Sequence, residues 1–215
     1  MSILITFEGI EGSGKTTQIS RLKNHLIARG HAVVVTREPG GCQIADRIRS
    51  ILLDPANDAM TSRAELLLYA AARAQHVSEV IRPALQTGQI VLCDRFTDAT
   101  LAYQGYGRKL DSALIKHLNE LATDSITPDL TLLFDLPVER GLGRALQREK
   151  ITQDSSEGRF EREALDFHRA VRNGYLDLAA AEPDRFRRID ADRPIDTIQA
   201  ELQVLIDRVY ETLQP

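Results

Sequence analysis

Five short runs of apolar, β-prone residues alternate with longer stretches of helical periodicity along the chain. Strands that read as continuous apolar runs, each separated by a helix, form a parallel sheet covered on both faces. Because crossovers between parallel strands are right-handed, the pattern predicts an open, doubly wound α/β domain. The predicted strands span residues 3–7, 32–36, 90–93, 130–134 and 186–189, and the predicted helices span residues 15–29, 43–53, 62–87, 111–123, 138–149, 160–181 and 195–213.

Length and composition limit the number of domains and the kinds of partner that we expect for this chain. A chain of 215 residues with 43% apolar residues suits one globular domain, residues 1–215. A net charge of −4 gives no sign of a nucleic-acid or membrane surface. The two cysteines lie far apart in no metal-ligand spacing, and no stretch approaches the ~20 apolar residues that span a bilayer. We therefore expect a cytoplasmic protein with reduced thiols that uses neither nucleic acid nor a membrane as partner.

The segment GIEGSGKT, residues 9–16, matches the pattern G-x-x-x-x-G-K-[ST] in full between a predicted strand and a predicted helix. Its glycines let backbone N–H groups turn inward onto phosphates. The lysine of this pattern reaches the outer phosphates, and the threonine offers its hydroxyl to Mg²⁺. The sequence thus predicts an ATP-type phosphate cradle formed by Gly9, Ile10, Glu11, Gly12, Ser13, Gly14, Lys15 and Thr16.

Other segments indicate which class of nucleotide-binding protein this chain belongs to. A GTPase needs a guanine-reading N/T-K-x-D segment, and the nearest string, RKLD at residues 108–111, lacks the first residue. Residues 150–159 are polar, contain glycine and are flanked by arginine-rich helical patterns, which is typical of a lid, placed at about residues 148–160. A small P-loop domain with such a cluster favours a small-molecule kinase. A non-catalytic ATP-binding module is the alternative from a different class.

The predicted third strand ends in Asp94-Arg95, at the edge where open α/β sheets bind their ligands. There Asp94 can serve the metal or its water, and Arg95 can grip a phosphoryl group through two N–H groups. Asp135 follows the fourth strand and is a rival carboxylate, for which we expect a structural role.

The motifs FEGIEGSGKTT, TREPGG, DR followed by TDATLAYQG, and the lid segment together resemble the thymidylate kinase family, from about residue 3 to about residue 195. The resemblance implies phosphorylation of dTMP to dTDP with ATP and Mg²⁺, on the way to dTTP. It also implies a homodimer, for which the helix at 62–87 is a candidate interface. Another nucleoside monophosphate kinase, with a different base pocket, is the alternative.

The resemblance also implies roles for individual residues. Glu11 faces the acceptor, near its sugar 3′-hydroxyl or the metal water. Tyr69, where the family usually has phenylalanine, stacks on thymine, and Arg73 binds a base carbonyl. Without the resemblance, these two residues would be a core tyrosine and a surface cation. The full acceptor set is Glu11, Arg37, Glu38, Arg49, Tyr69, Arg73, Arg95, Thr100, Tyr103 and Gln104.

One P-loop position decides which residue is expected to supply the catalytic charge. One branch of the family places an arginine in the P-loop directly after the acidic residue, where this chain has Gly12. The transferred group must then be neutralised from the lid, and similarity to the other branch assigns this to Arg159 ahead of Arg148 and Lys150. Cys42 stands where threonine is common. The implied catalytic residues are Glu11, Lys15, Asp94, Arg95 and Arg159, with Arg144 on the donor and Thr16 and Asp94 at the Mg²⁺.

Overall fold

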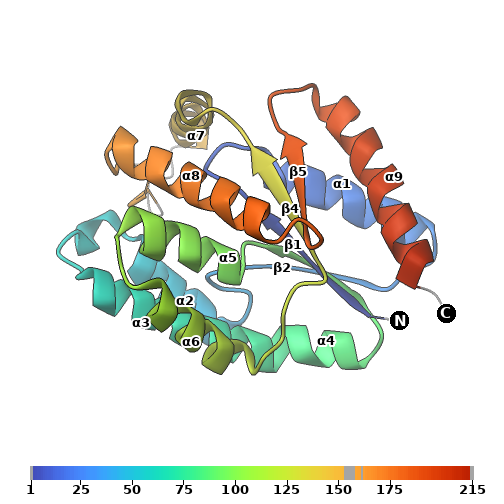
Figure 1. Cartoon of the computed structure of the whole chain (residues 1–215), viewed down its shortest axis with the longest axis horizontal. Coiled ribbons are helices and arrows are strands. Elements are labelled where there is room, and N and C mark those ends of the chain that lie inside the picture. The colour runs from blue at the N-terminus through green and yellow to red at the C-terminus, as the bar shows by residue number, and fades with distance from the viewer. Residues whose placement is uncertain (1, 153–157, 161, 214–215) are drawn as a thin grey trace.

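The fold is taken from a computed structural model that describes residues 2–152, 158–160 and 162–213. Five parallel strands form one sheet in the order β2-β3-β1-β4-β5 (Figure 1). Their bounds are Ile3–Glu8 (β1), Val33–Arg37 (β2), Ile90–Asp94 (β3), Leu130–Asp135 (β4) and Phe186–Asp190 (β5). All five strands and the parallel α/β class are therefore predicted correctly.

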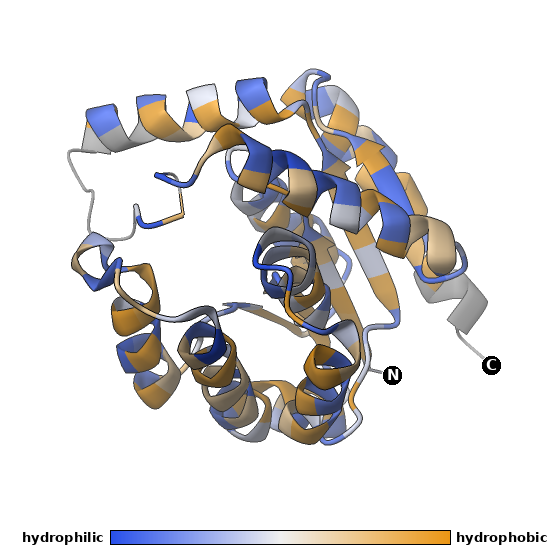
Figure 2. Ribbon diagram, turned by 60° about the vertical axis from the view of Figure 1, so that its left-hand side comes forward, coloured by the Kyte–Doolittle hydropathy of each residue, from blue (hydrophilic) through white to orange (hydrophobic). Residues whose placement is uncertain are grey.

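Helices cover both faces of the sheet (Figure 1). On one face, α1 (Lys15–Ala28) and α9 (Ile195–Leu213) pack together over β1 and β4. The alternate side chains Ile3, Ile5 and Phe7 of β1 point into this core. In Figure 2, hydrophobic and hydrophilic residues alternate along the helices around the sheet, as expected where each helix buries one face.

The other face carries the helices that surround the site. They are α2 (Gln43–Leu53), α3 (Ser62–His76), α4 (Arg82–Gln86), α5 (Thr97–Thr100), α6 (Ser112–Thr123), α7 (Val138–Thr152) and α8 (Leu165–Ala181). Thr61 caps α3 by accepting a hydrogen bond from the N–H of Ala64, and Asp111 caps α6 in the same way through Ala113. Within the described residues, no helix is both long and apolar enough to cross a membrane. Cys42 and Cys93 are both free thiols.

The helical predictions differ from the structure at three places. The helix predicted at 62–87 continues from α3 through one π-helical segment, Val77–Ile81, into α4. The helix predicted to begin at 160 begins at Leu165, because Phe160 instead packs against the rings of Tyr103 and Phe167. Residues 97–107 form α5 and a π-helical segment, Leu101–Gly107 (η3), that the sequence did not predict. This segment was not predicted because it contains two glycines and shows no clear apolar period.

The strand register brings the ends of β1, β2 and β3 together. Phe7 of β1 pairs with Asp94 of β3, and Arg37 of β2 pairs with the same residue. The loop that follows β1, the Asp94-Arg95 pair and the turn after β2 therefore emerge at one edge, where the carboxyl ends of the strands meet.

Candidate active site

A cleft of about 1100 Å³ opens at this edge of the sheet. It is lined by the loop after β1, the turn after β2, the end of β3, and side chains from α2, α3, α5 and η3. Most of the predicted site residues line it. They are Glu11, Gly12, Ser13, Gly14, Lys15, Thr16, Arg37, Glu38, Arg49, Tyr69, Arg73, Asp94, Arg95, Thr100, Tyr103, Gln104 and Arg144. Gly9, Ile10 and Arg159 are absent from the lining.

The P-loop needs its glycines for conformation and for space. Gly12 and Gly14 have φ values of +68° and +89°, in the left-handed region that other residues rarely adopt. A Cβ atom at Gly12 would lie 2.1 Å from the carbonyl oxygen of Gly141 in α7. The loop and α7 are thus in backbone-to-backbone contact.

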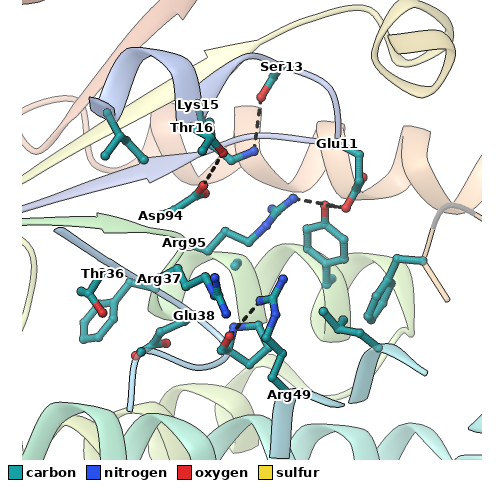
Figure 3. Close-up of a pocket in the computed structure, with 18 of the residues that line it drawn as sticks. Glu11, Ser13, Lys15, Thr16, Thr36, Arg37, Glu38, Arg49, Asp94 and Arg95 are labelled. Carbon is teal, nitrogen blue, oxygen red and sulfur yellow. Dashed lines mark hydrogen bonds and ion pairs between the residues drawn. The ribbon is translucent and has the colours of Figure 1, made fainter. Parts of the chain in front are cut away.

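Lys15 is folded into the P-loop. Its Nζ donates to the carbonyl oxygens of Gly9 and Ile10, both at 3.1 Å. It also donates to Oγ of Ser13 at 3.3 Å (Figure 3). Burial, reinforced by the positive charge of Arg95, lowers the pKa of Lys15 to about 8. A bound phosphate would place a negative charge next to this buried ammonium and stabilise its charged form.

Thr16 and Asp94 form the oxygen pair expected of a magnesium site. Oγ1 of Thr16 donates to Oδ2 of Asp94 at 3.2 Å across the gap between α1 and β3 (Figure 3). Mg²⁺ prefers hard oxygen ligands and binds through one or two protein groups together with substrate phosphates and water. The hydroxyl and carboxylate present here fit that donor set.

Arg95 joins the P-loop to the side of the cleft that η3 lines. Its Nη1 donates to the carbonyl oxygen of Gly9 at 2.8 Å and to the Tyr175 hydroxyl at 3.1 Å, while Nη2 donates to Oε1 of Glu11 at 3.2 Å. Its Cζ lies 4.8 Å from the centre of the Tyr103 ring. The residue has a φ of +67°, an uncommon conformation for a non-glycine residue and one that clusters at functional sites.

Glu11 lies between this arginine and Tyr103 of η3. Its Oε1 also accepts a hydrogen bond of 2.5 Å from the Tyr103 hydroxyl. Burial alone would raise the pKa of Glu11, but the close approach of His168, with Arg95 and Tyr103, holds that pKa well below its ordinary value. The carboxylate is therefore ionised, and its Oε1 is held by two donors.

Arg73 is fully buried. The prediction made without the family resemblance, a surface cation, is therefore wrong. It donates to Oε2 of Glu38 and Oδ1 of Asn119, both at 2.7 Å, and to the carbonyl oxygen of Phe96 at 3.0 Å. His76 holds the other oxygen of Glu38 at 3.0 Å. Arg73 is thus a preorganised donor on the cleft wall.

Other residues predicted to bind the acceptor line a polar and aromatic part of the cleft. Oγ1 of Thr100 is buried and has no hydrogen-bond partner among the described residues, so it can contact a bound molecule. The Tyr69 ring lies 6.5 Å from that of Phe160, centre to centre. Arg49 donates to the carbonyl oxygen of Pro39 at 2.8 Å, and Arg37 forms an exposed pair with Asp46 at 3.4 Å.

The lid residues are placed differently from one another. Nη2 of Arg159 donates to Oε2 of Glu65 at 2.6 Å, and Nε donates to the carbonyl oxygen of Leu52, so its buried guanidinium is engaged away from the cleft lining. A catalytic role for Arg159 stays a prediction. Arg144 lines the cleft near Asp192. Lys150 is exposed, while the side chain of Arg148 and residues 153–157 lie outside the described residues.

The structure adds residues that the sequence reasoning missed. Glu8 accepts hydrogen bonds from the Phe96 N–H and the Tyr175 hydroxyl, both at 2.7 Å. Burial, together with the negative charge of Asp98, raises the pKa of Glu8 to about 8. The one feature of the sequence that could have pointed to Glu8 is its position directly before the P-loop. Asp135 pairs with Arg172 at 2.7 Å and Arg188 at 2.6 Å, a structural arrangement.

A phosphate loop on a doubly wound sheet, opening into a cleft lined by several arginines, is the arrangement of a P-loop nucleotide kinase. A sequence model of the family described as thymidylate kinase matches residues 7–202. The chain belongs to the thymidylate kinase family.

Relatives with this name align along nearly the whole chain. The thymidylate kinase of Syntrophotalea carbinolica is 61% identical over 198 residues, covering 92% of each protein. That of Geobacter sp. (strain M21) is 63% identical, covering 99% of this chain and 95% of the relative. The crystal structure of thymidylate kinase from Ehrlichia chaffeensis has a TM-score of 0.76 at 34% identity, covering 95% of this chain and 98% of that one.

Proposed function

We propose that this chain transfers the γ-phosphoryl group of ATP to dTMP, releasing dTDP and ADP and so supplying the precursor of dTTP. The observation that carries the proposal is the placement of Arg95. Its guanidinium contacts the P-loop carbonyl of Gly9 and the acceptor-side carboxylate of Glu11 at the same time. A group migrating between two nucleotides would pass this position.

The transfer is in line and forms no covalent enzyme intermediate. Phosphoryl transfer is catalysed mainly by positioning and charge neutralisation. On the donor side, the P-loop N–H groups and Lys15 hold the β- and γ-phosphates, and Arg144 contacts the donor. Arg95 binds the acceptor phosphate, with Arg37 and Arg49 nearby on the cleft wall. When bound, Mg²⁺ would be held by Thr16 and Asp94 and would neutralise charge on the donor phosphates.

The acceptor pocket has features suited to a thymine deoxynucleotide. Tyr69 offers a ring face to the base, and Arg73, Thr100 and Gln104 offer polar groups. The Tyr103 ring is fixed by edge contacts with Phe160 at 5.5 Å and Tyr175 at 6.3 Å, centre to centre. A ring held this firmly against the sugar would exclude a ribose 2′-hydroxyl.

The test is ADP release from ATP·Mg²⁺ with dTMP, dUMP, the ribose analogue of dTMP, AMP, GMP and UMP as acceptors. We expect strong preference for dTMP, and Arg95→Lys should lower kcat/KM by at least ~100-fold because lysine cannot bind bidentately. Arg29→Lys, at the far end of α1, is the matched control. Preference for another monophosphate would show that the chain is a kinase with a different base pocket. Turnover of none of the six would show that it is a non-catalytic ATP-binding module.

We also propose that the protein acts as a homodimer in the cytoplasm. Helices α2 and α3 pack on each other and expose Ile44, Ile51 and Leu67, whose exposed fractions are 47%, 47% and 51%. Three exposed branched apolar residues on adjacent helices are suited to the self-complementary interface of a two-fold dimer. Sedimentation equilibrium should give a dimer that Ile51→Glu dissociates and Val204→Glu, on α9, does not. A monomeric unsubstituted protein would contradict the proposal.

A further inference from the structure

His168 in α8 is a fully buried histidine that faces the Glu11 carboxylate. Its Nδ1 lies 3.5 Å from Oε2 of Glu11, just beyond hydrogen-bond length. Within the described part of the chain, neither ring nitrogen of His168 has a hydrogen-bond partner, and neither has Oε2 of Glu11. Buried polar atoms left unpaired are costly, so two that face each other call for an explanation.

The two carboxylate oxygens of Glu11 differ in their hydrogen-bond partners. Oε1 accepts from Tyr103 and Arg95, which belong to η3 and to the end of β3. Oε2 faces only α8 among the contacts described, through His168. A donor to Oε2 would hold the carboxylate plane from its second side, and among the described residues His168 is the group placed to supply it.

The same helix also supports Arg95. Tyr175 lies seven residues, or two helical turns, after His168 and therefore on the same face of α8. Its hydroxyl accepts from Nη1 of Arg95 at 3.1 Å and donates to Glu8. One face of α8 thus presents His168 to Glu11 and Tyr175 to Arg95.

We propose that His168 is a positioning residue that orients Glu11 toward the acceptor. A shift of a few tenths of an ångström lets Nδ1–H donate to Oε2, which fixes the carboxylate while Oε1 is held by Tyr103 and Arg95. This rests on the proposed function, in which Glu11 serves the acceptor sugar or the metal water. A buried histidine that only fills space beside the Phe167 ring is the competing explanation, and it predicts different behaviour.

Kinetics of four variants separate the two explanations. His168→Phe keeps a ring without a donor, and His168→Asn places an amide N–H where Nδ1 lies. We expect His168→Phe to lower kcat/KM for dTMP by ~10-fold or more, the size of a lost bond to a charged group, without changing KM for ATP. His168→Asn should restore most of the activity, and His168→Gln, whose amide matches Nε2, should not. His25→Asn, a partly buried histidine of α1 that bonds Asp207, is the matched control.

A double-mutant cycle with Glu11→Gln provides the decisive comparison. If His168 acts through Glu11, adding His168→Phe to Glu11→Gln should cost less than ~3-fold, because the partner has already been lost. Equal losses in both backgrounds, or an Asn variant as weak as the Phe variant, would overturn the proposal and leave a packing role. If the Phe variant does not fold, the contrast between Asn and Gln still decides.

A readout without turnover keeps this test apart from that of the proposed function. Nitrogen-15 NMR of the imidazole in the nucleotide-free protein should show a proton on Nδ1 of His168, and its signal should shift in Glu11→Gln. A tautomer protonated on Nε2 alone would overturn the proposal even in an active enzyme. An inactive enzyme with the expected signal would instead contradict the proposed function.

Discussion

The Tyr103 hydroxyl donates a 2.5 Å hydrogen bond to the Glu11 carboxylate, so this ring on the cleft wall is tied to the phosphate loop. Tyr103→Phe removes this bond and keeps the ring. We expect kcat/KM for dTMP to fall by ~10-fold, because a hydrogen bond to a charged group is lost, with the preference over the ribose analogue unchanged. Tyr106→Phe, an exposed tyrosine of the same segment, should have no effect in the same assay. Improved use of the ribose analogue by Tyr103→Phe would show that the hydroxyl sets sugar selectivity.

Arg159 and Arg108 share the buried Glu65 carboxylate, which makes them a matched pair. Removing either arginine should lower the free energy of unfolding by roughly 2–4 kcal/mol, because a buried charge loses a partner. If Arg159 moves to the transferred phosphoryl group, Arg159→Ala should also cut kcat by ~10³-fold or more with little change in dTMP affinity, whereas Arg108→Ala should not. Chemical denaturation and steady-state kinetics measure the two effects. Equal kcat values would assign catalysis to another lid residue.

The lowered pKa of Lys15 predicts proton uptake when ATP binds. With a pKa of about 8 in the nucleotide-free protein, the ammonium is about half deprotonated at pH 8, and bound phosphates raise that pKa again. Calorimetry at pH 8 in two buffers of different ionisation enthalpy should give different apparent binding enthalpies, corresponding to about half a proton. Lys15→Arg, whose guanidinium stays charged, should abolish the difference between buffers. An equal difference in that variant would place the proton elsewhere.

Glu8 makes stability fall as the solution becomes alkaline. Its pKa is raised from 4.5 in an unfolded chain to about 8 in the folded protein, so the folded state binds the proton more tightly. Its contribution is complete below about pH 4.5 and is lost as the pH rises through about 8. Glu8→Gln should therefore gain stability relative to the unsubstituted protein between pH 5 and 9, as measured by denaturation at each pH.

The control for this titration is Glu182→Gln. Its hydrogen bond with Arg185 lowers the pKa of Glu182, so the variant should show no such trend above pH 6. A stability difference for Glu8→Gln that does not change with pH would mean that Glu8 is ionised in the folded protein throughout this range.

The strands and the phosphate loop were predictable because their signals are local. The runs around Ile5 and Leu132 are apolar on both faces, and the loop motif fixes its own neighbours. The partners of charged side chains were not predictable. Glu65 and Arg159 are 94 residues apart, and Glu8 and Tyr175 are 167 apart, so only the folded topology joins them. The short helix after Arg95 escaped prediction because its form follows from packing on α8.

The contact between Gly12 and Gly141 constrains how this enzyme could evolve. A side chain at residue 12 collides with α7, and a side chain at residue 141 would meet the carbonyl oxygen of Glu11 at 2.5 Å. A lineage with this packing cannot acquire an arginine in the loop by one tolerated substitution, because α7 would first have to move. We therefore expect a fitness valley between a loop arginine and the lid arginine that we predict for this chain, so that a descendant would change from one to the other only if several changes arrived together.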